Sequence, residues 1–445
     1  MKKFLTFIVV FTYNLVFISA QTAQQFILKR NEMQVNAVKN DPFNVVKITP
    51  KISLEPNFSA PFIAISFKIN DYPKEQVKKI ALKFKKKNAA EFETIFVKPA
   101  HDIEAEENYV SELVFLPIDI TEIFLEIENP ISNNFEFSTI NFRAFYPSNN
   151  KIESSDAIKF RGVDDCSLPK AVSRSVWGAS YNLYDLIQYK NIPEYTTVTH
   201  LIVHHGSSPN VATNWAAVVA SYFDYHVNTN GWSDIGYNYL VAPDGTLFVG
   251  RGGGDNVLGA HYCGKNAHTM GVCMIGTYND VLPTDTALQT LVKILSWKSK
   301  KETINPNGAA LLGGSIISNI DGHRSGCATD CPGDMVWSYL PKMRERVVAA
   351  VNACITTTPT NEIVASGFKI SPNILKDGFL YCQGSFKSDT YWQITDINGR
   401  IYNSGSFLIE TENFKTPIEN LGAGVYFFSI RNEYAVKTDK FLKVE

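Results

Sequence analysis

The stretch Val203-His204-His205-Gly206-Ser207 organises both the fold and the chemistry of this 445-residue chain. It closes a run from Leu201 to His205 that is typical of a buried strand. Because successive side chains of a strand point to opposite faces, only one of the two histidines can face a shared site. Far downstream, the segment from His323 to Gly333 contains a further histidine and two cysteines.

His204, His323 and Cys331 are candidate ligands of one zinc ion. Zinc prefers imidazole and thiolate donors, and three protein ligands leave one tetrahedral position open, as in catalytic zinc sites. The spacing alone leaves simpler interpretations open, because His-x7-Cys is not the pattern of a closed zinc finger. A lone histidine in a strand is more often a core residue, which is the expectation for His200, His226, His261 and His268. Cys331 could be half of a disulfide.

The segment around these residues is predicted to be mixed α/β. Apolar residues recur at helical spacing in three places, which indicates amphipathic helices that face the core. The stripes are Trp215, Val218, Val219, Tyr222 and Phe223, then Leu288, Leu291, Val292 and Leu295, then Met343, Val347, Val348 and Val351. Strands are expected over 201–205, 237–241, 246–249 and 271–276.

A series of short motifs runs in order through the same segment. The motifs are Ser173-Arg174-Ser175-Val176-Trp177-Gly178-Ala179, His200 to His205, Gly231 to Tyr239, Asp244-Gly245-Thr246, Gly250-Arg251-Gly252, Gly259-Ala260-His261, Gly322-His323-Arg324 and Cys331-Pro332-Gly333. In this order and spacing they resemble the family of peptidoglycan recognition proteins and type 2 N-acetylmuramoyl-L-alanine amidases. The resemblance extends to about Cys354.

The resemblance implies a set of site residues. His204, His323 and Cys331 would bind Zn2+, and Tyr237 would be catalytic. The cation would polarise the amide carbonyl and acidify water, while Tyr237 would hydrogen-bond the oxyanion or the attacking water. Thr329, two residues before the ligand cysteine, would donate a hydroxyl hydrogen bond nearby. Structural alternatives are a packed strand residue for Tyr237 and loop capping for Thr329.

The resemblance also implies the reaction, which is hydrolysis of the amide between the lactyl group of N-acetylmuramic acid and L-alanine in bacterial peptidoglycan. Family members that only bind peptidoglycan typically lack the ligand cysteine, so Cys331 favours an amidase over a non-catalytic binding protein. A cytoplasmic recycling amidase is a third alternative, which the N-terminus opposes. Cys327 departs from the family pattern and could form a bridge or compete for metal.

Residues 1–20 have the features of a secretory signal peptide, with Met1-Lys2-Lys3 before an apolar run and cleavage after Ala20. The apolar run is shorter than the roughly 20 residues of a membrane span. Residues 21–160 contain strand-like runs separated by turns and are predicted to form an all-β sandwich of unknown role. His101 is expected at its surface. The amidase domain is expected over 162–354.

Residues 366–445 are predicted to form a second all-β sandwich, in which Asn398-Gly399 indicates a hairpin. The motifs are Ile370-Ser371-Pro372-Asn373, Ile397-Asn398-Gly399-Arg400, Leu421 to Tyr426 and the ending Lys440 to Val444. They resemble the C-terminal sorting domain of type IX secretion cargo. The resemblance implies contact with the secretion machinery and a secreted or outer-membrane surface protein that has passed through the periplasm. A carbohydrate-binding accessory module is the alternative.

Composition limits the partners, since a net charge of -2 argues against a general nucleic-acid binder. We expect a monomer whose partner is bacterial peptidoglycan. Export permits disulfides. A bridge between Cys166 and Cys354 would close the central domain, and one between Cys263 and Cys327 is a second expectation, while Cys273 fits a buried thiol.

Overall fold

The computed structural model describes residues 22–29, 35–37, 45–48, 51–54, 59–72, 79–100, 108–130, 138–149, 167–355, 365–376, 378–386, 390–397, 400–406, 411–431 and 436–444. The expected signal peptide, His101, Cys166 and the Asn398-Gly399 turn lie outside these residues. Within the described residues, no helix combines the length and the apolar character needed to cross a membrane.

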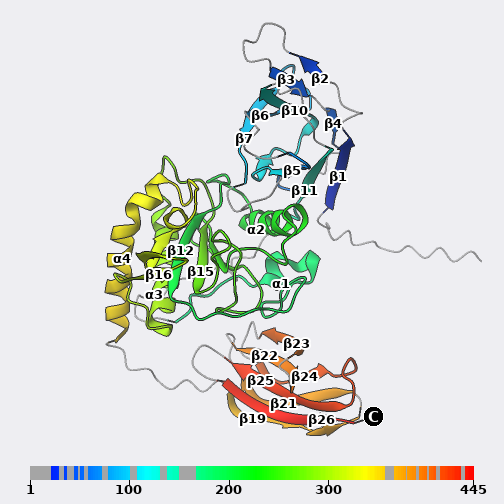
Figure 1. Ribbon diagram of the computed structural model, residues 1–445. Coiled ribbons are helices and arrows are strands. Elements are labelled where there is room, and N and C mark those ends of the chain that lie inside the picture. The colour runs from blue at the N-terminus through cyan, green and yellow to red at the C-terminus, as the bar shows by residue number, and fades with distance from the viewer. Residues whose placement is uncertain are drawn as a thin grey trace, which may run out of the picture.

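The central part, green to yellow in Figure 1, is a mixed sheet with helices on both faces. Its elements are α1 (Arg174–Trp177), η3 (Ala179–Tyr181), β12 (His200–His205), α2 (Trp215–Asp224), η4 (Tyr225–Thr229), β13 (Tyr239–Val241), β14 (Leu247–Val249), β15 (Thr269–Met274), α3 (Asp285–Lys301), β16 (Ala309–Leu312), β17 (Ser315–Ser318), β18 (Ile320–Gly322), η5 (His323–Ser325) and α4 (Asp334–Ile355). The sheet order is β14-β13-β15-β12-β18, in which only β14 is antiparallel to its neighbour.

Alternation along the central strands sends their side chains into two cores. Val203 of β12 packs with α3 and α4 on one face, whereas Leu240 of β13 and Cys273 of β15 pack with α2 on the other. The three predicted apolar stripes lie on α2, α3 and α4, and their spacing marks the core-facing sides of these helices. The strand expected at 237–241 begins only at Tyr239. Tyr237 therefore lies in the loop before β13.

The N-terminal part, blue to cyan in Figure 1, is a sandwich of two antiparallel sheets. Its strands are β1 (Thr22–Lys29), β2 (Val35–Ala37), β3 (Val45–Ile48), β4 (Lys51–Ser53), β5 (Ile63–Ile69), β6 (Lys79–Lys86), β7 (Glu93–Val97), β8 (Tyr109–Val110), β9 (Val114–Leu116), β10 (Ile120–Pro130) and β11 (Thr139–Tyr146). One sheet has the order β1-β11-β5-β8 and the other β2-β3-β10-β6-β7. Phe67 and Phe142 from the first sheet meet Phe84 and Leu125 from the second in one core, as expected for a sandwich.

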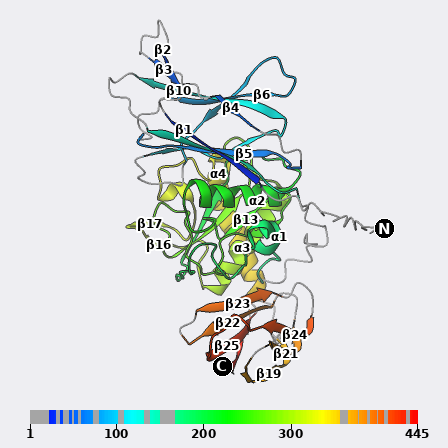
Figure 2. The ribbon, with the colours of Figure 1, turned by 90° about the vertical axis from the view of Figure 1, so that its right-hand side faces the viewer.

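The outer face of sheet β1-β11-β5-β8 packs against the central part. Both views show β5 beside α2 (Figures 1 and 2). Ala64 of β5 and Phe145 of β11 share a buried cluster with Tyr222 of α2. Arg143 of β11 donates from Nε and Nη2 to the two carboxylate oxygens of Asp224, each at 2.7 Å. Strand β5 of the first sheet is therefore covered on both faces, whereas the outer face of β1 is exposed.

The C-terminal part, orange to red in Figure 1, is also built from two sheets. Its strands are β19 (Ala365–Ser371), β20 (Ile374–Leu375), β21 (Phe379–Phe386), β22 (Tyr391–Asp396), β23 (Ile401–Ser406), β24 (Thr411–Pro417), β25 (Gly424–Arg431) and β26 (Val436–Lys443). The sheet orders are β19-β21-β24 and β20-β26-β25-β22-β23. Residues of both sheets, such as Leu380 and Phe428, form a core that contains none of the described residues of the other two parts.

The cysteines of the described residues fall into two groups. Cys263 and Cys327 form a disulfide that joins positions 64 apart in the sequence. Cys354 is also disulfide-bonded, and its expected partner lies outside the described residues. Buried free thiols are found at Cys273, Cys331 and Cys382.

Replacing Arg143 with Met should lower the free energy of unfolding by about 3 kcal/mol, because the Asp224 carboxylate would stay buried without its cation. Urea unfolding followed by tryptophan fluorescence measures the change. Lys86→Met is the matched control, since Lys86 and Glu93 form a solvent-screened pair on the surface of the same sandwich that contributes little to stability. Equal losses in the two variants would show that the Arg143 pair does not hold the two parts together.

Candidate functional site

The three candidate ligands meet at the carboxyl ends of neighbouring parallel strands. His204 is near the end of β12, and His323 directly follows β18, whose Gly322 is in register with Val203 of β12. Cys331 comes from the loop before α4. Parallel strands direct their carboxyl ends to the same edge of a sheet, which is where ligands bind in open α/β folds. The topology thus brings together residues that are more than a hundred positions apart.

The ligand atoms of His204, His323 and Cys331 lie within 4.8 Å of one another, and all three residues are buried. Sγ of Cys331 is 3.7 Å from Nδ1 of His204. The backbone N–H of His205 donates to the same sulfur at 3.3 Å. A hydrogen bond to sulfur stabilises a thiolate, the form in which cysteine binds metals.

His204 is oriented by a chain of hydrogen bonds. Oγ1 of Thr269 donates to the carbonyl oxygen of Asn266 at 2.7 Å, so it can accept from Nε2 of His261 at 3.2 Å. Burial, and to a smaller extent Arg251, lowers the pKa of His261 to about 3, and its ring is neutral with one N–H. With that proton on Nε2, Nδ1 of His261 accepts from Nε2 of His204 at 3.0 Å. Nδ1 of His204 then keeps its lone pair, as a metal ligand requires.

The donor set fits zinc. Two imidazoles and a thiolate are among its usual ligands, and a hydrogen-bond acceptor for the second ring N–H of a ligand histidine, the part that His261 plays for His204, is typical of such sites. A second group, Cys263, His323 and Cys327, also comes within ligand distance. In this group both sulfurs are used in the disulfide, which leaves His323 to the first set. Cys327 is thus a bridge residue in this structure and not a competing ligand.

Tyr237 and Thr329 lie beside this cluster. The buried ring of Tyr237 is 5.2 Å from the ring of His204, measured between centroids, and 5.5 Å from that of His226. Oγ1 of Thr329 accepts from the backbone N–H of Cys331 at 3.1 Å, which caps the loop that carries the cysteine. The Thr329 side chain is partly exposed and lines a cleft.

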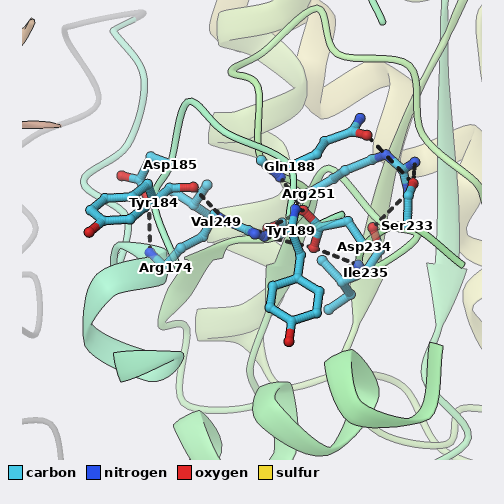
Figure 3. Close-up of polar contacts among 12 residues, drawn as sticks. Arg174, Tyr184, Asp185, Gln188, Tyr189, Ser233, Asp234, Ile235, Val249 and Arg251 are labelled. Atoms are coloured by element: carbon cyan, nitrogen blue, oxygen red, sulfur yellow. Dashed lines mark hydrogen bonds and ion pairs between the residues drawn. The ribbon is translucent and has the colours of Figure 1, made fainter. Parts of the chain in front are cut away.

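A buried ion pair holds the segment that leads to Tyr237 (Figure 3). Arg174 donates to both carboxylate oxygens of Asp234, at 3.0 and 2.8 Å, and both side chains are fully buried. Asp234 also accepts from the backbone N–H groups of Tyr189, Ile235 and Gly252. Since Ile235 is two residues from Tyr237, the carboxylate fixes the path of the chain into the site.

Arg251 supports the same segment from the other side. It donates to the carbonyl oxygen of Ile235 at 3.2 Å and to Oγ of Ser233 at 2.8 Å (Figure 3). Burial lowers the pKa of Arg251 below its usual value. Two guanidinium groups therefore brace one loop from residues 233 to 236.

A cleft of about 790 Å³ opens beside Cys331 and His205. The central part contributes the loop from Ser207 to Asn210, together with Thr277, Asn279 and the segment 328–331. The N-terminal sandwich supplies the opposite wall. That wall consists of Ile95, Lys98, Pro99, Ala100, Glu112, Leu113, Val114 and Phe115. A space of this size lies within the range of about 300–1,000 Å³ that is usual for ligand sites.

Sequence reasoning missed two contributions to the site. His261 was given the interpretation of an ordinary core histidine, yet it contacts His204. The motif Gly259-Ala260-His261 was the available signal. The wall from the N-terminal sandwich had no signal in its local sequence. Of the other histidines expected in the core, His200 and His226 are buried and contact Thr199 and Trp232, whereas His268 is exposed, so that expectation is wrong for His268.

Comparison with known proteins gives two family matches. Residues 194–334 match the N-acetylmuramoyl-L-alanine amidase family, and residues 376–444 match the secretion system C-terminal sorting domain. Peptidoglycan-recognition protein SC1a of Drosophila melanogaster is 33% identical over 147 residues, which are 32% of this chain and 72% of that protein. The chain belongs to the family of peptidoglycan-recognition proteins and N-acetylmuramoyl-L-alanine amidases.

Other relatives match the same region. The human N-acetylmuramoyl-L-alanine amidase is 34% identical over 179 residues, but these are 39% of this chain and only 28% of the human protein. Among solved structures, Drosophila PGRP-LB is 26% identical, with 38% of this chain and 91% of that chain covered and a TM-score of 0.31. The family matches thus account for the central and C-terminal parts, and neither covers the N-terminal sandwich.

Replacing Arg174 with Met should destabilise the amidase domain by about 3–5 kcal/mol, because Asp234 would keep a buried charge without its partner. The shift in the midpoint of thermal or urea unfolding measures this. Arg346→Met serves as the control, since Arg346 is partly exposed on α4 and donates to the neutral hydroxyl of Tyr339. An Arg174 variant as stable as the Arg346 variant would contradict the bracing role.

Proposed function

We propose that the protein is a zinc-dependent N-acetylmuramoyl-L-alanine amidase that hydrolyses the amide between the lactyl group and L-alanine of peptidoglycan. The observation that carries this proposal is the buried set of His204, His323 and Cys331, with ligand atoms within 4.8 Å, beside a cleft. The family match of residues 194–334 supports the bond and the substrate class. The family match by itself supports the more general statement that the protein acts on or binds peptidoglycan.

Each residue of the site has a defined task in this proposal. His204 and His323 would hold the zinc with neutral nitrogens and Cys331 with its thiolate, while His261 keeps His204 in the required tautomer. Zinc bound there would supply a Lewis acid that polarises the scissile carbonyl and acidifies water.

Tyr237 would contribute at the oxygen where negative charge develops. Its ring lies beside His204, and Arg174 and Asp234 fix the loop that carries it. A preorganised hydroxyl directed at that oxygen acts mainly in the transition state. Thr329 would place its hydroxyl at the wall of the cleft while it caps the loop of Cys331.

The alternative is a peptidoglycan-binding protein without catalysis. Both proteins would use the same cleft, but only the amidase needs a stoichiometric metal. The presence of Cys331 in the buried cluster favours the amidase, because a binding protein has no use for a thiolate at the base of the cleft.

The proposed destination is the cell surface or the medium, and the chain is proposed to act as a monomer. The match of residues 376–444 to a secretion system C-terminal sorting domain supports export. The expected signal peptide at residues 1–20 would direct the chain across the inner membrane first. The self-contained core of the C-terminal sandwich is consistent with a unit that serves transport and not catalysis.

Cys331→Ala should abolish hydrolysis of purified muropeptides and reduce bound zinc from one ion per chain to near zero. Loss of one of three ligands removes the charged donor that anchors the cation. Metal analysis and mass spectrometry of the digested muropeptides measure the two effects. Cys382→Ala is the control, because Cys382 is a buried free thiol of the C-terminal sandwich. Normal zinc and full activity in the Cys331 variant would refute the assignment.

Tyr237→Phe should lower kcat by roughly 10²–10³ with little change in KM, the loss expected for one hydrogen-bond donor to a developing oxyanion. Steady-state kinetics on a muropeptide measure both constants. Tyr239→Phe is the matched control, since Tyr239 packs against Trp297 in the core on the other face of the sheet. An unchanged kcat for the Tyr237 variant would exclude the hydroxyl from the reaction.

A further inference from the structure

The cleft beside Cys331 has walls from two parts of the chain that are far apart in sequence. Segments after β7 and around β9 of the N-terminal sandwich face the loop after β12 and the loop of Cys331. The family match begins at residue 194, so it does not include the first wall. This wall is a feature of this chain beyond the amidase domain.

Hydrogen bonds join the two segments of the wall to each other. The N–H of Ala100 donates to the carbonyl oxygen of Val110 at 2.8 Å, and the N–H of Glu112 donates to that of Lys98 at 2.9 Å. The N–H of Lys98 in turn donates to a carboxylate oxygen of Glu112 at 3.0 Å. The Glu112 carboxylate is thus used to hold the wall together.

The wall is also fixed to the central part. The ring of Phe115 packs edge-on against Tyr222 of α2, with centroids 6.3 Å apart. The hydroxyl of Tyr225 donates to the carbonyl oxygen of Ser111 at 2.6 Å. Together with the ion pair between Arg143 and Asp224, these contacts hold the sandwich against the central part, so that it forms a fixed wall of the cleft.

The wall is mostly apolar and carries one cation, Lys98, and one carboxylate, Glu112, which accepts from the backbone N–H of Lys98. Ile95, Pro99, Leu113 and Phe115 offer aliphatic and aromatic surface. Among the described residues that line the cleft, Lys98 is the one lysine or arginine. A ligand that fits both features combines apolar side chains with an anionic group.

The ammonium group of Lys98 reaches across the cleft toward the loop that carries Cys331. Its Nζ is 3.6 Å from Oδ2 of Asp330, the residue between Thr329 and Cys331. The two side chains are 66% and 78% exposed, so water screens their attraction and the pair contributes little by itself. A carboxylate of a bound ligand can therefore replace Asp330 as the partner of Lys98 at small cost.

We propose that the N-terminal sandwich forms the second wall of the substrate cleft and that Lys98 binds a carboxylate of the stem peptide. This inference rests on the proposed function, which places the lactyl–L-alanine amide at the buried cluster. A stem peptide carries free carboxylates and apolar side chains along an extended chain. Lys98 and the apolar wall match these two features, and the adjoining loop of Cys331 places the reacting amide next to them.

The test compares two muropeptides that differ only in whether their stem carboxylates are free or amidated. Dissociation constants and kcat/KM are measured for the full chain and for Lys98→Ala. The variant should bind the free-carboxylate form about twofold to fivefold more weakly, as expected for one partly screened ion pair, and bind the amidated form unchanged. Lys87→Ala is the control, since Lys87 is exposed on the same sandwich outside the cleft.

Asp330→Asn separates ligand binding from a role of Lys98 as a clasp between the two walls. If Lys98 binds the ligand, this variant keeps the preference for the free carboxylate. If Asp330→Asn and Lys98→Ala both weaken binding of the two muropeptides to the same extent, the clasp explains the data and the proposal is overturned. Equal affinity of the full chain for both muropeptides also overturns it. Binding with that preference but without hydrolysis would instead refute the proposed function and leave the second wall standing.

Discussion

The buried ion pair between Arg174 and Asp234 is the interaction on which the site depends most. One carboxylate receives a guanidinium and three backbone N–H groups, and so it joins α1, the segment at Tyr189 and the loop before β13. Breaking such a pair leaves an unpaired charge in a water-free interior, which costs far more than an exposed pair gains. The loop that carries Tyr237 consequently has one low-energy path, fixed before any ligand binds.

The second constraint is the parallel pairing of β12 with β18 and β15. A shift of one residue in a strand exchanges its faces, so the same register that buries Val203 in one core presents His204 on the other face. His261 then acts on His204 from behind, through a hydrogen bond that sets its tautomer. The register that packs the sheet therefore also sets the positions of the candidate metal ligands.

Local patterns in the sequence predict helices and strands well, but they predict contacts between distant residues poorly. The stripes on α2, α3 and α4 follow from helical periodicity, and the ligand set from ordered motifs. The hydrogen bond between His261 and His204, and the approach of Lys98 to Asp330 across more than two hundred residues, depend on tertiary packing that no local pattern encodes. One clue was present. The run Ile63-Ala64-Ile65-Ser66-Phe67 has no charged residue, as expected of a strand covered on both faces.

The burial of β5 on both faces explains which parts of the chain form one structural unit. Ala64 and Phe145 of the N-terminal sandwich share a buried cluster with α2, whereas the core of the C-terminal sandwich is formed, within the part of the chain that the structure describes, by its own residues alone. Removing the first sandwich would expose the apolar outer side of α2, but removing the second would expose no shared core. The chain is thus best understood as a two-part unit that carries the candidate site, followed by a separable tail, since shared cores resist separation and independent cores permit it.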